Sequence, residues 1–137
     1  MKVRVFAESD TEAVAALWRK VFPDNPSHNR PEADIARKLK VQPELFYVAE
    51  SKARIVGTAM GGYDGHRGWV YYVAVDPGYR RRGIGKALMK AVEAGLKASG
   101  CSKLNLQVRE GNEEAVEFYT RLGYNVEPRV SMGKHFE

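Results

Sequence analysis

The chain has 137 residues, which is enough for one domain with a buried core. Its only cysteine, Cys101, excludes an internal disulfide and is typical of a reducing compartment, so we expect a cytoplasmic protein. No metal-ligand spacing joins Cys101 to a histidine, and no run reaches the ~20 apolar residues of a membrane span. We therefore expect no metal and no membrane partner. The net charge of +5 makes nucleic-acid binding one hypothesis, although the clearest basic cluster lies in a glycine loop.

The first part of the chain predicts one strand and two helices. Residues 2–6 alternate polar and apolar side chains, as a half-buried strand does. Residues 9–12, Ser-Asp-Thr-Glu, have the pattern of a capping box and predict the start of a helix. The inner side of that helix carries five apolar residues: Val14, Leu17, Trp18, Val21 and Phe22. Residues 23–31 form a loop, either an acceptor-pocket wall or a plain connection, and Pro31 begins a second helix.

The middle of the chain predicts an antiparallel meander. Three segments rich in β-branched and aromatic residues are the expected strands: residues 45–50, 54–62 and 69–75. The short polar segments between them are turns. Gly57, Gly61 and Gly62 have no side chains to pack, which indicates a bulge or the close approach of another element.

The chain is organised around residues 73–86, which read VAVDPGYRRRGIGK. An apolar strand stops at Asp76-Pro77-Gly78, three arginines follow, and apolar residues at 84, 88, 92 and 96 give one face of a helix. The first turn of that helix carries free N–H groups and the positive end of the dipole. Gly83 and Gly85 have no Cβ, so a large anion can approach the backbone. The loop predicts a site for a diphosphate-bearing cofactor; the alternative is a basic loop that only caps a helix.

Two familiar phosphate loops are excluded. A P-loop requires Lys and then Ser or Thr after its last glycine, where this chain has Ile84-Gly85. The dinucleotide-binding fingerprint requires a third glycine, and Leu88 occupies its place. What remains is Arg80-x-x-Gly83-x-Gly85 after an apolar strand.

The end of the chain predicts further strands and a fourth helix. Residues 104–108 alternate as a strand does. Asn112 is the expected N-cap of a helix over residues 113–122, which Gly123 ends. Two short strands are expected on either side of Pro128: residues 124–127 and 129–134.

Two motifs resemble the GNAT acetyltransferase superfamily. Arg80-x-x-Gly83-x-Gly85 is similar to its acyl-CoA signature, and NEEAVEFYTRLGY over residues 112–124 is similar to its N-x-x-A-x-x-F-Y-x-x-L-G-F/Y ending. Among members, the chain resembles the YpeA-like bacterial acetyltransferases through IVGTAMGGYDGHRG and the arginine-rich loop. The resemblance implies a single α/β (mixed α+β) domain over residues 1–137. It would have a mostly antiparallel sheet of six to seven strands and four helices, splayed around an acyl-CoA site.

The resemblance also implies the residues of a cofactor site: Val73, Ala74, Val75, Arg80, Arg81, Arg82, Gly83, Ile84, Gly85, Lys86, Asn112 and Tyr119. The backbone of Val73 and Val75 would pair with the pantetheine arm as an added strand does. N–H groups of residues 81–86 would hold the pyrophosphate, and Asn112 would contact the pantetheine or adenine side. Tyr119 would be catalytic and protonate the leaving thiolate, since a tyrosine of pKa near 10 stays protonated at neutral pH; the alternative is a core aromatic.

The general base is not evident from the sequence. The Val75 N–H would polarise the acetyl carbonyl, and positioning would supply much of the rate. Some relatives have a glutamate on the strand before the loop, and others have one on the next strand. In this chain Trp69 lies near the first position and Gln107 occupies the second. Neither can accept a proton, which leaves Asp64, His66, Glu110 or water as the base.

Three functions are compatible with these features. The first is an acetyl-CoA-dependent N-acetyltransferase that acts on a primary amine, with acetyl-CoA as cosubstrate and no metal. The second is a non-catalytic acyl-CoA-binding sensor, which the missing carboxylates favour. The third is a small basic nucleic-acid-binding protein, although we expect no nucleic-acid partner. The acceptor and the oligomeric state are open, with a homodimer as one option.

Overall fold

The computed structural model describes residues 1–25 and 30–136. They fall into two compact units, Met1–Leu106 and Gln107–Glu137. Of the predicted loop over residues 23–31, residues 26–29 lie outside the described part of the chain. Within the described part, the chain forms five strands and four α-helices.

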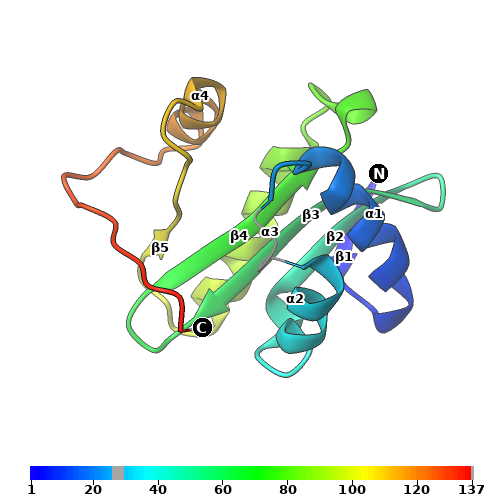
Figure 1. Ribbon diagram of the computed structural model, residues 1–137, viewed down its shortest axis with the longest axis horizontal. Helices are drawn as coiled ribbons and strands as arrows, with labels where there is room; N and C mark the ends of the chain where they lie inside the picture. Colours follow the sequence, from blue (N-terminus) through cyan, green and yellow to red (C-terminus); the bar gives the residue numbers. More distant parts are fainter. Residues whose placement is uncertain (26–29, 137) are drawn as a thin grey trace. The chain divides into compact units, whose positions relative to one another are not determined.

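The first unit holds one mixed sheet with the strands in chain order (Figure 1). Its strands are β1 (Lys2–Val5), β2 (Phe46–Ser51), β3 (Arg54–Tyr63), β4 (Gly68–Val75) and β5 (Leu104–Asn105). The first three pairings are antiparallel, and only β4 and β5 run parallel. The predicted meander and the mixed α/β class are confirmed, although the described sheet has five strands where six to seven were expected.

Helices cover both faces of this sheet (Figure 1). On one face lie α1 (Thr11–Val21) and α2 (Pro31–Lys38), and on the other lies α3 (Ile84–Ala98). Gly57 shows why α3 comes so close. A Cβ at Gly57 would lie 2.9 Å from Leu88 Cδ1 and 3.0 Å from Ile84 Cγ2. The predicted close approach at this glycine is therefore confirmed, and α3 is the element that approaches.

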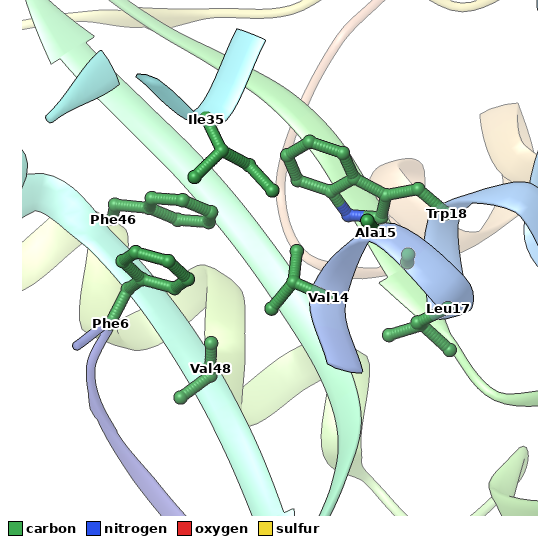
Figure 2. Packing of buried hydrophobic residues seen from close by; sticks show 9 residues of the cluster. Phe6, Val14, Ala15, Leu17, Trp18, Ile35, Phe46 and Val48 are labelled. Carbon is green, nitrogen blue, oxygen red and sulfur yellow. The ribbon is translucent and has the colours of Figure 1, made fainter. Parts of the chain in front are cut away.

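The core between α1, α2 and the sheet is built on stacked rings (Figure 2). Phe6 and Phe46 stack with centroids 4.4 Å apart, and Trp18 stacks on Phe46 at 5.9 Å. Nine buried side chains make up this cluster: Phe6, Val14, Ala15, Leu17, Trp18, Ile35, Phe46, Val48 and Ala74. Burying a large apolar side chain stabilises a fold by about 1.5–3 kcal/mol, so this cluster fixes both helices on the sheet.

The predicted capping box at the start of α1 is wrong. A short 3-10 turn, Glu8–Asp10, precedes the helix, and it moves the helix start past Ser9. The Asp10 carboxylate is engaged elsewhere. It accepts the Ala7 N–H at 2.9 Å. It also forms a bidentate ion pair with the Arg4 guanidinium, whose two terminal nitrogens donate to its oxygens at 2.8 and 3.0 Å. The partly buried ion pair with Arg4 therefore decides the local geometry.

The second unit contains α4 (Glu113–Arg121). Asn112 caps this helix as predicted, since its Oδ1 accepts the Ala115 N–H at 3.2 Å. The two strands expected around Pro128 are wrong, because no residue from 107 to 136 is paired as a strand. An apolar side chain stabilises a strand only when it is buried against a neighbour, and the apolar side chains here are exposed: Val126, Val130, Met132 and Phe136. Likewise, β5 ends at Asn105 rather than at residue 108.

Candidate active site

The strand β4 carries a bulge in its middle. Thr58 pairs with Ala74 and Met60 pairs with Tyr71, so two steps along β3 match three steps along β4. The extra residue lies at Tyr72, whose φ is +51°. A bulky residue rarely adopts this left-handed conformation, so surrounding contacts must hold it in place.

Neighbouring side chains hold both the backbone carbonyl and the side chain of Tyr72. The Thr58 hydroxyl donates to the Tyr72 carbonyl at 2.7 Å and accepts the Trp18 Nε1–H at 2.8 Å. The ring of Tyr72 stacks on the Trp18 indole, and its hydroxyl donates to Asp34 Oδ2 at 2.6 Å. Burial, and then the hydrogen bond to Asp34, raise the pKa of Tyr72. The hydroxyl is therefore a permanent donor at neutral pH.

Beyond the bulge, β4 has one unpaired edge. The ladder with β5 consists of Gly68 with Leu104 and Trp69 with Asn105. Residues 70–75 have no strand on that side within the described residues. Since Asp76 donates its N–H to Val56 on β3, alternation turns the backbone groups of Val73 and Val75 to the open edge. This is the edge to which an extended ligand can add as a strand.

Asp76 shapes the loop that follows β4. The residue is 6% exposed, and its Oδ1 accepts the Gly78 N–H at 2.9 Å. Lys20 of α1 lies 3.1 Å from Oδ2. The Gly78 N–H first, and Lys20 to a lesser degree, lower the pKa of Asp76. The loop is thereby fixed to both β4 and α1 before it turns into α3.

The turn into α3 presents a row of free N–H groups. Ala87 makes the first helical bond, to the Gly83 carbonyl at 3.0 Å. Within the described residues, none of the N–H groups of residues 81–86 donates to a protein acceptor. Gly83, with φ +78°, is the N-cap, and a Cβ there would have no heavy atom within 4 Å. An anion can therefore reach this backbone.

Positive side chains surround these N–H groups. Arg80, Arg81, Arg82 and Lys86 are exposed, and Arg82 lies 4.9 Å over the Tyr79 ring. Ile84 is different, because its side chain is buried against Gly57 of β3 and only its backbone N–H is free for a ligand. This arrangement of backbone donors and exposed cations suits a pyrophosphate.

Tyr119 and Asn112 lie in the second unit. Tyr119 is half-buried and packs edge-on against Phe118 at 4.9 Å and Tyr124 at 6.0 Å. Burial raises the pKa of Tyr119 to about 12. Within the described residues, its hydroxyl has no hydrogen-bond partner. The side chain therefore retains a proton that it can donate. Asn112 uses its carbonyl oxygen to cap α4, which leaves only its NH₂ group for a ligand.

The structure separates two predicted base candidates from the open edge of β4. Asp64 and His66 lie in the turn between β3 and β4, at least about 16 Å along the strand from Val73 and about 23 Å from Val75. Asp64 Oδ1 accepts the N–H of Arg67 at 2.7 Å and of His66 at 2.8 Å, and these bonds lower its pKa. Asp64 therefore stabilises the turn. Glu110 is an exposed residue of the second unit.

Other site types are less well supported within the described residues. No group of three or more His, Cys, Asp or Glu side chains there could hold a metal ion. No described helix is long and apolar enough to cross a membrane. A shallow depression of about 510 Å³ beside α1 is lined by charged groups that pair with one another: Arg4 with Asp10 and Glu50, and Lys20 with Asp76.

The sequence matches proteins of one enzyme family over most of its length. A family model described as "Acetyltransferase (GNAT) family" matches residues 11–124. An acetyltransferase of Yersinia enterocolitica is 48% identical over 134 residues, covering 98% of this chain and 94% of that protein. One of Pectobacterium atrosepticum is 46% identical with the same coverage. The chain therefore belongs to the GNAT acetyltransferase family and is an N-acetyltransferase.

Solved structures agree with this fold. Ard1 of Thermoplasma volcanium has a TM-score of 0.82 at 28% identity, over 92% of this chain and 83% of that one. The aminoglycoside N-acetyltransferase AAC(6')-Iy, solved with a CoA-containing bisubstrate analogue, has a TM-score of 0.82 over 98% of this chain and 97% of that one. Its identity of 19% shows a shared fold alone.

Proposed function

We propose that this acetyltransferase uses acetyl-CoA and transfers the acetyl group to a primary amine by direct attack in a ternary complex. The observation that carries this proposal is the succession, along one chain segment, of an open strand edge and a row of free N–H groups. The edge suits the pantetheine arm and the N–H groups suit the pyrophosphate. The CoA moiety in the AAC(6')-Iy complex supports the same choice of donor.

Each part of the chain then has a defined task. Val73 and Val75 bind the pantetheine amides through their backbone groups, and the N–H groups of residues 81–86 bind the pyrophosphate. Arg80, Arg81, Arg82 and Lys86 add charge at the phosphates. The Val75 N–H polarises the acetyl carbonyl. Asn112 contributes its NH₂ group to the pantetheine or adenine side.

Tyr119 supplies the proton of the reaction. The amine nitrogen forms a bond to the acetyl carbon, and the bond from that carbon to sulfur breaks. Tyr119 gives its hydroxyl proton to the leaving thiolate, the amine loses its own proton to water, and Tyr119 regains a proton from water. A tyrosine with a pKa of about 12 holds this proton throughout the physiological range. Positioning supplies much of the remaining rate, because a thioester is already activated.

The extent of the domain and its location follow from the same features. The family match runs over residues 11–124 and includes parts of both units, which supports one acetyltransferase domain over residues 1–137. The single cysteine supports a cytoplasmic location. A homodimer is a further option for size measurements to test.

The test combines binding with turnover. Calorimetry with CoA should show one site, and release of free thiol from acetyl-CoA should rise with at least one member of a panel of amines and peptides. CoA binding without turnover on any amine would favour the acyl-CoA sensor. Steeply salt-dependent binding to DNA or RNA, without CoA binding, would favour the basic nucleic-acid protein.

A further inference from the structure

The bulge in β4 decides which backbone groups of this strand reach its open edge. Successive residues of a strand point their backbone groups to opposite edges, so one extra residue at Tyr72 reverses the edge that every later residue faces. With the bulge, Ala74 pairs with Thr58 and Val75 faces outward. The ligand-binding edge therefore depends on a bulge whose central residue is in an unfavourable conformation.

Among the described residues, Thr58 is the one side chain that donates a hydrogen bond to the Tyr72 carbonyl. It is fully buried, and its hydroxyl lies between Trp18 Nε1 and the Tyr72 oxygen, at 2.8 and 2.7 Å. An indole N–H can only donate and a carbonyl can only accept. The single hydrogen of the Thr58 hydroxyl is therefore committed to Tyr72, and Trp18 prevents it from rotating away.

The ring of Tyr72 makes further contacts that its carbonyl does not make. It stacks on the Trp18 indole with 3.7 Å between centroids, and its hydroxyl is bonded to Asp34. Trp18 thus acts twice, through its ring face and through its N–H. Thr58 and Trp18 are fully buried, so neither side chain can touch the acyl donor.

We infer that Thr58, oriented by Trp18, is a positioning residue for the pantetheine arm. It holds the bulge that presents Val73 and Val75 to the ligand, and it has no effect on the pyrophosphate loop. The inference rests on the proposed use of acetyl-CoA. According to this inference, β3 and α1 contribute to binding the pantetheine arm through Thr58 and Trp18. The glycine loop binds only the pyrophosphate.

Thr58→Val tests this role because valine has the same shape and no hydroxyl. Affinity is measured for CoA and for 3′-phosphoadenosine 5′-diphosphate, which carries the diphosphate but no pantetheine. We expect Thr58→Val to weaken CoA binding about tenfold and to leave the nucleotide affinity unchanged. The KM for acetyl-CoA should rise by a similar factor, while the KM for the amine stays the same.

Two further variants separate positioning from folding. Thr58→Ser keeps the hydroxyl and should restore CoA affinity, and Trp18→Phe keeps a ring against Tyr72 and should cost about threefold. The control is Val48→Ala, a substitution on β2 in the same core, which should lower stability without any preference for one ligand. If Thr58→Val does not fold, the CoA affinities of Thr58→Ser and Trp18→Phe are compared instead. Only Trp18→Phe should then bind CoA more weakly than the wild type.

The outcomes are distinguishable. CoA affinity unchanged in Thr58→Val, or an equal loss for CoA and the nucleotide, overturns the positioning role and leaves the proposed function intact. A wild-type protein that binds neither ligand overturns the proposed function, and the inference with it.

Discussion

The indole of Trp18 lies flat on the phenol ring of Tyr72, with 3.7 Å between ring centroids and 6° between the ring planes. The contact joins α1 to the one bulged residue of β4. Because α1 is in turn fixed by the aromatic core, the conformation of the bulge is tied to the most buried part of the first unit. The helix therefore supports the strand edge that we propose for the acyl donor.

The hydroxyl of Tyr72 should contribute less to stability than its ring. Tyr72→Phe keeps the stack on Trp18 and removes the hydrogen bond to Asp34, so we expect a loss of about 1 kcal/mol in the free energy of unfolding. Trp18→Ala removes the stack and opens a cavity, and we expect a loss of about 3–5 kcal/mol. Urea unfolding measures both. A loss in Tyr72→Phe as large as in Trp18→Ala would show that the hydroxyl, rather than the ring, secures the bulge.

A carboxylate at Gly83 should prevent CoA binding while the protein stays folded. Gly83→Glu places a negative side chain in the open space beside the free N–H groups, and we expect CoA affinity to fall at least about 100-fold. Gly65→Glu is the matched control, because Gly65 also has a positive φ and open space, in the turn between β3 and β4. Each variant should lose about 1–2 kcal/mol of stability from backbone strain. Equal CoA affinity in the two variants would place the pyrophosphate elsewhere.

Removing the hydroxyl of Tyr119 should affect turnover and not binding. We expect Tyr119→Phe to lower kcat about 100-fold and to leave the Kd of CoA unchanged. With a pKa of about 12, Tyr119 stays protonated below pH 11, so it should cause no fall in kcat between pH 7 and 10. Tyr63→Phe, at the turn after β3, is the control. Full activity in Tyr119→Phe would assign the proton to another donor.

Asp76 should stabilise the loop mainly through its hydrogen bond to the Gly78 N–H. Asp76→Asn keeps an acceptor for that N–H and loses only the partner of Lys20, which is half exposed, so we expect a change below about 1 kcal/mol. Asp76→Ala loses both interactions and should cost about 1–3 kcal/mol. CoA affinity should follow the same order. Equal effects in the two variants would mean that the charge, rather than the hydrogen bond, is what matters.

The lowered pKa of Asp76 gives this loop a defined pH dependence. A carboxyl whose pKa is lower in the folded state contributes stability above its ordinary value near 3.8, and the contribution disappears as the pH falls through the lowered value. Acid unfolding of the wild type should therefore include a component that Asp76→Asn lacks. Unfolding curves at pH 7 and pH 3 measure the difference. If the free energy of unfolding changed equally between these pH values in the wild type and in Asp76→Asn, the lowered pKa of Asp76 would be contradicted.

Local patterns predicted the order of structural elements in residues 73–86 well. The end of the strand, the glycine turn and the start of α3 are encoded within residues 73–86, and the structure has them in that order. Asn112 was likewise predicted as a cap, because capping depends on the next three residues. The Asp-Pro-Gly sequence is also typical of the hydrogen bond that Asp76 accepts from the Gly78 N–H.

What the sequence missed depends on contacts between distant residues. The bulge at Tyr72 needs Thr58 and Trp18, which come from β3 and α1, and no short pattern contains all three. The prediction that Trp18 is a core residue is confirmed. The sequence does not show that its N–H also donates a hydrogen bond to Thr58. The expected strands around Pro128 failed for the same reason, since a strand forms only where a neighbour pairs with it.

The central claim is that the backbone of residues 81–86 binds the pyrophosphate of CoA and that the open edge of β4 binds its pantetheine arm. Titration of ¹⁵N-labelled protein with CoA, followed by the chemical shifts of assigned backbone amides, tests it most directly. The account predicts that the amides of residues 81–86, Val73 and Val75 shift most, and that the nucleotide fragment without pantetheine shifts only the first group. Saturation with CoA that leaves those amides unmoved would contradict it.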